Sequence, residues 1–310
     1  MITSQNPLVS VIIPNYCHAK YLDQRIQSIL NQTFQDFEII ILDDKSTDNS
    51  VEIINKYKNN PHVHKIILNK ENSGNTFLQW NKGIREANGK IIWIAESDDY
   101  CEPTLLEELI KAYFHAPNTV IAYSTSMIVN EKGVSQLPII KHPNQYLKGK
   151  DYIKRYLSLE AFIWNASSAI FNKDKALSIA PLYMKYKGAG DYMFWTELSE
   201  LGNVAIVNKQ LNYFRRHDDV ITNKRDADGS NYLAGREILN YMTEKIRFSW
   251  LRKRYVMAYH ARKLQHKTFN TDNIRKEVWD IWEIGKYQTS FDKFLFKVGN
   301  YLIYHFHYYI

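Results

Sequence analysis

Acidic side chains cluster at one point of the sequence, in the segment ESDD at residues 96–99. This segment directly follows the apolar run 91–95, whose length and composition predict a buried strand. Adjacent carboxylates repel each other and raise each other's pKa unless a cation lies between them. Mg²⁺ typically binds one or two carboxylates together with the phosphate oxygens of a substrate. The segment therefore predicts a divalent-cation site for a phosphorylated ligand, although such residues can also cap the helix that Pro103 opens.

Polar or aromatic residues follow two further predicted strands. The mostly apolar runs 9–13 and 38–42 are followed by Pro-Asn-Tyr (14–16) and by Asp43-Asp44. In an open parallel sheet, ligands bind beyond the carboxyl ends of the strands. Asp43 on its own is typical of a turn residue. Three such ends on one edge of a sheet nevertheless predict a binding site there.

The elements that must position these residues alternate along the chain. Helical patterns of apolar residues separate the first four strands, and the runs at 120–123, 169–171 and 204–207 indicate further strands. This alternation predicts a mostly parallel central sheet flanked by helices, with continuous apolar runs buried on both faces. From about Tyr232 the pattern is helical. We therefore predict an α/β catalytic domain at residues 1–220 and a basic, aromatic-rich helical extension at 221–310.

Composition excludes several classes of protein. The 310 residues are 45% apolar and 24% charged, which is typical of a folded protein and not of a disordered one. Cys17 and Cys101 stand in unrelated contexts, so they predict neither a disulfide framework nor a zinc site. The sequence shows no signal peptide and no apolar run of about 18 residues. We therefore expect a cytoplasmic protein.

The net charge of +7 lies in the C-terminal part of the chain. Residues 221–310 contain 16 Lys and Arg against nine Asp and Glu, and residues 245–267 contain eight Lys and Arg without an acid. Neutrality of the first 220 residues argues against a nucleic-acid-binding core. A basic helix with interleaved aromatic residues predicts that the protein contacts the inner face of an anionic membrane. The alternative is that its apolar stripe packs on the catalytic domain.

Five segments occur in an order that carries a family resemblance. They are PLVSVIIPNY at 7–16, FEIIILDDKSTDNS at 37–50, ENSGNTFLQWNKGIREANGKIIWIAESDDY at 71–100, GDYMFWTEL at 190–198 and YFRRH at 213–217. Together they resemble the family 2 glycosyltransferases of GT-A fold, the inverting group that builds bacterial polysaccharides. The resemblance implies a nucleotide-sugar donor (we expect a UDP-sugar), Mn²⁺ or Mg²⁺, and a saccharide or lipid-linked acceptor.

The same resemblance implies roles for residues on the donor side. Pro14 and Tyr16 would line the nucleotide-base pocket, and Asp44 would hydrogen-bond the base. Asp98 and Asp99 resemble the DxD element, which divides ribose contact and metal coordination between its members.

The resemblance also implies that Asp191 is the general base on the acceptor side and that His217 reaches the metal or the diphosphate. One base suffices, because a metal-neutralised diphosphate is already a good leaving group. We also place Trp164, Asn165 and Trp195 on the acceptor side. For Trp164 and Asn165, a buried strand is an equally open interpretation.

The chain departs from the family pattern at two positions. Glu96 stands where the family often has Asp, so which of Glu96, Asp98 and Asp99 contacts the metal is left open. Trp80 stands where the family tends to have Arg, so a contact with the diphosphate would have to come from Lys82 or Arg215.

Two other functions compete with this interpretation. A sugar-phosphate nucleotidylyltransferase would need a Gly-rich, basic loop after the first strand, and residues 14–18 provide none. A catalytically inactive nucleotide-sugar-binding module would not need the intact acids Asp44, Asp98, Asp99 and Asp191.

Overall fold

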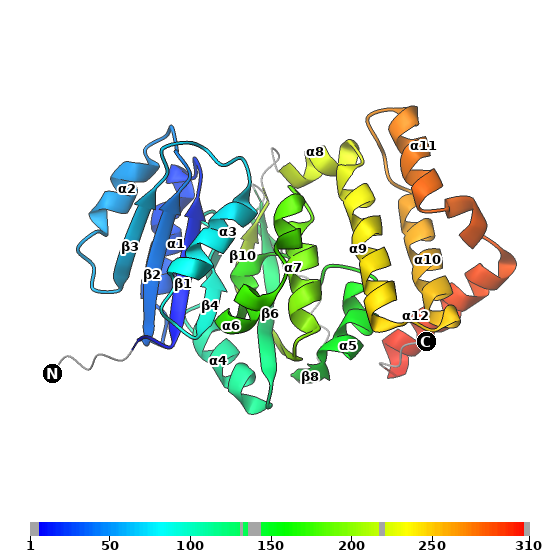
Figure 1. Ribbon diagram of the computed structural model, residues 1–310, viewed down its shortest axis with the longest axis horizontal. Helices are drawn as coiled ribbons and strands as arrows, with labels where there is room; N and C mark the ends of the chain where they lie inside the picture. The colour runs from blue at the N-terminus through cyan, green and yellow to red at the C-terminus, as the bar shows by residue number, and fades with distance from the viewer. Residues whose placement is uncertain (1–5, 131–132, 136–143, 217–220, 307–310) are drawn as a thin grey trace. The chain divides into compact units, whose positions relative to one another are not determined.

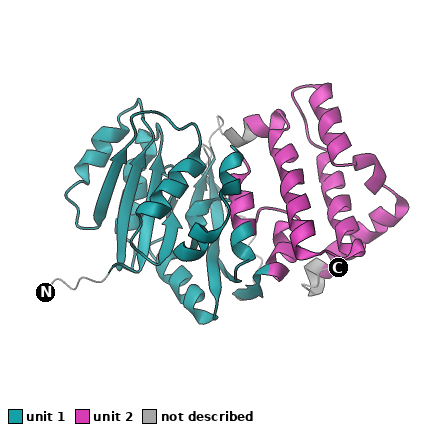
Figure 2. Cartoon of the chain, viewed as in Figure 1, with its two compact units in different colours: residues 1–149, 163–187, 197–217 teal, residues 150–162, 188–196, 218–310 magenta. Residues whose placement is uncertain are grey.

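The computed structural model describes residues 6–130, 133–135, 144–216 and 221–306. The chain forms two compact units (Figure 2). The first contains residues 1–149, 163–187 and 197–217, and the second contains residues 150–162, 188–196 and 218–310. The second unit thus combines the C-terminal third of the chain with two short segments from its middle.

A mixed β-sheet forms the centre of the first unit (Figure 1). Among the described residues its main path runs β3-β2-β1-β4-β9-β6-β10-β5, with β7 paired to β6 and β8 to β10. The neighbours β3-β2-β1-β4 are parallel, whereas β9 lies antiparallel to both β4 and β6. The strands are β1 (Val9–Asn15), β2 (Phe37–Asp43), β3 (Val63–Leu68), β4 (Ile91–Ile94), β5 (Tyr100–Cys101), β6 (Thr119–Asn130), β7 (Gly133–Ser135), β8 (Gln145–Lys148), β9 (Ala169–Asn172) and β10 (Asn203–Arg215).

Helices cover both faces of this sheet, as the continuous apolar runs predict. In β1, Val11 belongs to the core that the first helices complete, and Ile12 lies against the opposite helix α3. A Cβ on Gly83 of α3 would lie only 2.4 Å from Ile12 Cγ2, so glycine permits this close approach. The helices and turns are α1 (Ala19–Leu30), α2 (Ser50–Lys56), α3 (Thr76–Glu86), α4 (Leu105–His115), η2 (Ala166–Ser168), α6 (Lys173–Ser178) and η3 (Pro181–Lys185).

The second unit is helical, as predicted for the end of the chain. It contains η1 (Ile153–Leu157), α8 (Ile221–Ala227), α9 (Ser230–Ile246), α10 (Trp250–Leu264), α11 (Asp272–Ile281), η4 (Ile284–Tyr287) and α12 (Ser290–Phe306), while α5 (Gly149–Tyr152) and α7 (Gly190–Ser199) begin or end in the first unit. No helix in the described part of the chain is long and apolar enough to cross a bilayer.

The basic segment 245–267 differs from its predicted form. It is not one helix, because α9 ends before Arg247, which has a φ of 53°, and Ser249 caps α10 by accepting a hydrogen bond from Arg252 N at 3.1 Å. Its apolar stripe, which includes Met257 and Leu264, is buried. The expectation that this stripe faces a membrane is therefore wrong, because its side chains form part of the protein core. Trp250 is the exception and is 66% exposed.

Candidate active site

The carboxyl ends of β1, β2 and β4 lie side by side at one edge of the sheet. Parallel pairing places Asn15 beside Asp43 and Ile12 beside Ile94, so the residues that follow these strands share that edge. Pro14 is buried within β1, whereas Tyr16 directly follows the strand and is 49% exposed. An exposed ring at a strand end is available for stacking on a flat ligand.

Asp43 and Asp44 have different environments. Asp43 accepts hydrogen bonds from Ser46 Oγ at 2.6 Å and from Asn15 Nδ2 at 2.8 Å, so it fixes the turn after β2. This geometry matches the turn interpretation of Asp43. Asp44 is 5% exposed and points instead toward the segment after β3.

The carboxylate of Asp44 organises the loop at 69–75. It accepts hydrogen bonds from Asn69 Nδ2 at 2.7 Å, from Ser73 Oγ at 2.7 Å and from Gln79 Nε2 at 2.9 Å. Lys82 Nζ donates to Asn69 Oδ1 at 2.6 Å, so Lys82 belongs to the same network. The structure thus brings together two residues of the predicted donor side, and the contact of Asp44 with a base stays a prediction.

Asp99 is almost fully buried, with 1% of its surface exposed. Its Oδ2 accepts hydrogen bonds from Asn165 Nδ2 at 2.5 Å and from Ser167 Oγ at 2.6 Å, and its Oδ1 accepts one from Arg215 N at 2.9 Å. Burial, followed by the nearby charge of Asp98, raises the pKa of Asp99 to about 7. The carboxylate is held firmly, and a positive charge nearby would favour its ionised form.

Glu96 is fixed by two partners from different elements. Its Oε1 accepts a hydrogen bond from Trp80 Nε1 at 2.9 Å, and its backbone N donates to Ser167 Oγ at 3.0 Å. Burial and then the charges of Asp98 and Asp99 raise the pKa of Glu96 to about 8. Trp80 therefore positions an acid of the cluster, which gives a physical reason for this residue at a position where the family tends to have Arg.

Arg215 also lies at the acid cluster. Its Nε donates to the backbone oxygen of Asp98 at 2.8 Å, and its guanidinium lies 4.5 Å from the ring centre of Tyr21. Its Nη2 donates to Gln24 Oε1 at 2.9 Å. Arg215 thus holds the segment of Asp98 in place, and its charge lies beside the predicted diphosphate site.

A buried arginine lies near the acids and was not among the site residues predicted from the sequence. Arg25 is fully buried, and its guanidinium lies 5.1 Å from the ring centre of Trp93. Its charge lowers the pKa values of Glu96 and Asp99 and so opposes the effect of burial. The sequence held one signal for this residue, because Arg25 lies beside the apolar stripe of the first predicted helix.

The residues predicted for the acceptor side differ in their exposure. Asn165 is 7% exposed, and besides its bond to Asp99 its Oδ1 accepts a hydrogen bond from Asn212 Nδ2 at 3.1 Å. Asn165 therefore contacts the acid cluster from within the protein and positions Asp99. Trp164 is 38% exposed and remains available to a ligand. Trp195 is only 1% exposed, and this burial does not favour the contact with an acceptor that the sequence suggested.

Asp191 belongs to the second unit, in the first turn of α7. It is half-buried, and its Oδ1 accepts a hydrogen bond from Tyr192 N at 2.8 Å. Burial raises the pKa of Asp191 to about 6, which suits a group that must accept a proton near neutral pH. His217, which was predicted to reach the metal or the diphosphate, lies outside the described residues.

The donor set fits a hard divalent cation that shares its ligands with a substrate. Within the described ranges, no three His, Cys, Asp or Glu side chains come together as a complete metal-binding group. Glu96 and Asp98 are half-buried, and Asp99 keeps spare acceptor capacity on Oδ1. One or two of these carboxylates would leave several coordination positions to phosphate oxygens and water, the arrangement that Mg²⁺ prefers.

Comparison with known proteins identifies the family. The model of glycosyl transferase family 2 matches residues 10–176. A chondroitin synthase of Pasteurella multocida is 41% identical over 128 residues, which cover 41% of this chain and 13% of that protein. An uncharacterized glycosyltransferase of Haemophilus influenzae is 30% identical over 227 residues, covering 68% of this chain and 66% of its own length. The chain thus spans only a small part of the Pasteurella relative.

Solved structures show the same fold. S. aureus TarS 1-349 in complex with UDP-GlcNAc superposes with a TM-score of 0.66 at 18% identity, covering 95% of this chain and 80% of that one. This likeness confirms the predicted GT-A architecture with its C-terminal helices. Since the family model also covers more than half of the sequence, the chain belongs to glycosyl transferase family 2.

Proposed function

We propose that this protein is an inverting glycosyltransferase that moves a sugar from a nucleotide-sugar donor to an acceptor hydroxyl. The observation that carries the proposal is the acid cluster at the end of β4, with Asp99 buried and Glu96 and Asp98 half-buried, beside the exposed Tyr16 at the end of β1. An aromatic platform for a base next to carboxylates for a metal-bound diphosphate is the combination that a nucleotide sugar requires.

A UDP-sugar is the donor that the comparisons support best. The TarS structure was solved with UDP-GlcNAc, and one relative is named a chondroitin synthase. We therefore propose that the acceptor is a growing saccharide or a lipid-linked precursor and that the reaction belongs to cell-surface polysaccharide synthesis.

Asp98 and Asp99 would hold Mn²⁺ or Mg²⁺, with Glu96 beside them. The ion would neutralise the negative charge that develops on the departing diphosphate. Ser167 and Asn165 keep the Asp99 carboxylate in one orientation through hydrogen bonds of 2.6 and 2.5 Å. Arg215 fixes the backbone of Asp98 and contributes a second positive charge at the same place.

Asp191 would take the proton of the attacking hydroxyl. A carboxylate with a pKa of about 6 is mostly ionised at neutral pH, yet basic enough to accept a proton as the new bond forms. The acceptor oxygen would bond to the anomeric carbon from the side opposite the diphosphate while the bond to the diphosphate breaks, and this single displacement would invert the anomeric centre.

Release of UDP from a panel of UDP-sugars tests this proposal, with Mn²⁺ and with EDTA. We expect metal-dependent release that Asp98→Ala abolishes, because the ion that would neutralise the diphosphate loses a ligand. Asp36→Ala serves as the control because Asp36 is exposed and lies outside the cluster. NMR of the product should show the inverted anomer.

Other outcomes would favour the competing functions. Pyrophosphate release from UTP and a sugar phosphate would indicate a nucleotidylyltransferase. Donor binding without turnover, with every acceptor class tried, would indicate an inactive binding module.

A further inference from the structure

One side of α12 exposes aromatic rings together with cations. Phe291, Phe294 and Tyr301 are 44%, 62% and 56% exposed, and Lys293 and Lys297 are exposed beside them. At 3.6 residues per turn, these five residues fall on one broad arc of the helix.

The opposite side of α12 is packed within its own unit. Asp292 and Leu295 are buried, and a Cβ on Gly299 would lie 2.1 Å from Tyr255 Cε2 of α10. The exposed arc is therefore the side of α12 that does not pack against other elements of its unit. It carries rings and cations but no acid, since the only acid of α12 is the buried Asp292.

The aromatic surface continues onto the beginning of α10. Trp250 is 66% exposed, and its ring stacks with that of Phe291 at 6.2 Å between centroids. The Arg254 guanidinium lies 5.7 Å from the Trp250 ring and 5.4 Å from the Phe291 ring. The two helices thus present one continuous surface, which we call the α12 face: Trp250, Phe291, Lys293, Phe294, Lys297 and Tyr301.

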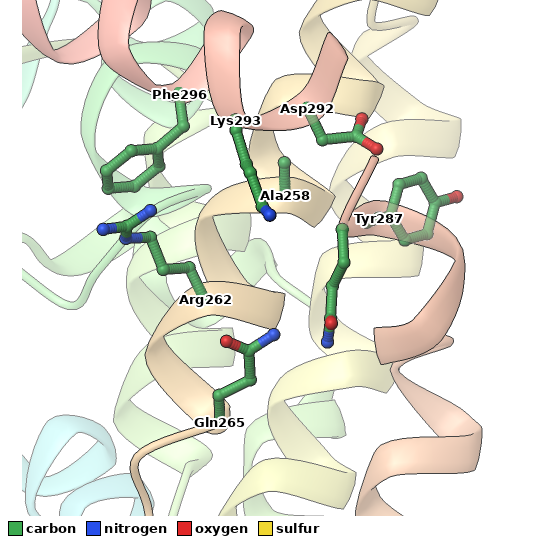
Figure 3. A pocket seen from close by; sticks show the side chains of 8 residues that line it. Ala258, Arg262, Gln265, Tyr287, Asp292, Lys293 and Phe296 are labelled. Carbon is green, nitrogen blue, oxygen red and sulfur yellow. The ribbon is translucent and has the colours of Figure 1, made fainter. Parts of the chain in front are cut away.

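A small hollow borders this face between α10, η4 and α12 (Figure 3). Its volume is about 160 Å³, and its lining includes Arg262, Gln265, Lys293 and Phe296. Arg262 lies 4.8 Å from the ring centre of Phe296, and neither Arg262 nor Lys293 forms an ion pair within the described residues.

The acid in the hollow, Asp292, does not cancel this charge. Its carboxylate accepts hydrogen bonds from Arg254 Nε at 2.7 Å and from Thr289 Oγ1 at 2.6 Å, and these partners hold its pKa below the usual value. The remaining charge of Arg262 and Lys293 makes the hollow suited to a phosphate group.

We propose that the α12 face docks on an anionic phospholipid bilayer, with a lipid phosphate in the hollow between Arg262 and Lys293. Trp250 and Tyr301 favour headgroup depth because each combines an apolar ring with a polar group, the phenylalanine rings add apolar surface, and each nearby cation adds attraction to anionic lipid. A second copy of the chain fits this face less well, because twofold pairing would bring its own cations together. The proposal goes beyond the glycosyl transfer and does not depend on it.

Co-sedimentation of the full chain with vesicles tests this inference. We expect binding to phosphatidylglycerol-containing vesicles, little binding to phosphatidylcholine alone, and release at raised salt. Lys293→Glu should weaken binding about 30-fold, because it removes one cation and adds one anion at the surface. Phe294→Ser should weaken it about tenfold, because it removes an exposed ring that would lie in the bilayer.

Matched variants control for charge and exposure. Phe114→Ser alters a ring that is 61% exposed in the first unit, and Lys276→Glu reverses an exposed charge on α11. Both should bind as the parent does, and circular dichroism should show all four variants folded.

Three results would overturn the inference. The first is equal binding to neutral vesicles, and the second is unchanged binding of both Lys293→Glu and Phe294→Ser. The third is a dimer that Phe294→Ser dissociates while anionic vesicles bind nothing, which would assign the face to a second copy. UDP release without vesicles, measured on the same preparation, reports on the proposed function separately.

Discussion

At the scale of single residues, Ser167 is the partner that joins two acids of the cluster. Its hydroxyl donates to Asp99 Oδ2 at 2.6 Å and accepts from Glu96 N at 3.0 Å. Ser167→Ala would leave one oxygen of a buried carboxylate with a single donor, a loss typically of about 1–3 kcal/mol. We expect roughly tenfold weaker binding of UDP with Mn²⁺ in calorimetric titration, with the fold retained.

Ser124→Ala is the matched control for that variant. Ser124 is equally buried, but its hydroxyl has no hydrogen-bond partner within the described residues, so its removal should change neither binding nor stability appreciably. Equal UDP affinity in both variants would show that the hydrogen bonds of Ser167 do not position the metal site.

Asp191 gives a prediction about pH. Its raised pKa of about 6 means that the ionised, basic form dominates above that pH and is lost as the pH falls through it. The turnover number should therefore fall about tenfold per pH unit below 6. Asp191→Asn should keep donor affinity and lose turnover, on the order of 10²-fold or more. A rate within a few fold of the parent would assign the proton to another group.

The sequence predicted some of these residues because their signal is local. Asp98 and Asp99 stand three and four residues after an apolar run, and the run itself shows where the strand ends. Ser167 and Asn165 carry no such signal, because they lie 68 and 66 residues from Asp99 in the sequence and contact it only in the folded protein. Arg25 was missed for a related reason, since charge beside an apolar stripe normally indicates a solvent-exposed side.

At the scale of elements, β1, β2 and β4 could be predicted because parallel strands buried on both faces are almost continuously apolar. The antiparallel direction of β9 could not, since strand direction depends on tertiary pairing. The break between α9 and α10 was likewise missed. The left-handed Arg247 and the cap at Ser249 interrupt a stripe whose spacing still looks helical.

The contact of α3 with β1 yields a stability prediction. Gly83→Ala would ordinarily favour the helix by about 1 kcal/mol, but its Cβ would lie 2.4 Å from Ile12 Cγ2 in a packed core. We expect net destabilisation of about 1–3 kcal/mol in urea unfolding, because overpacking forces the neighbouring atoms to shift.

Gly285→Ala separates packing from backbone effects, since its Cβ would have no neighbour within 4 Å. That variant should unfold at nearly the same urea concentration as the parent. If Gly83→Ala proved as stable as the parent, α3 would have room to move away from β1, and the close approach would not be required.

At the scale of the whole molecule, charge and chemistry are distributed differently along the chain. Residues 1–220 contain as many acids as bases and include the strand ends of the candidate site, whereas the net charge of +7 lies beyond them. Changes in the C-terminal helices should therefore alter binding to anionic surfaces more than binding of a nucleotide.

A thermal-shift panel of nucleotides tests the molecule as a whole. A ligand at 100 times its dissociation constant stabilises the fold by about 2.7 kcal/mol, and each kcal/mol raises the melting temperature by about 2–4 °C in domains of 150–250 residues. UDP with Mn²⁺ should therefore raise the midpoint by roughly 5–10 °C. Asp98→Ala and EDTA should each remove most of the shift, and other nucleoside diphosphates should shift it less. An equal shift in EDTA would show that nucleotide binding needs no metal, and the absence of a shift with every nucleotide would argue against the donor site itself.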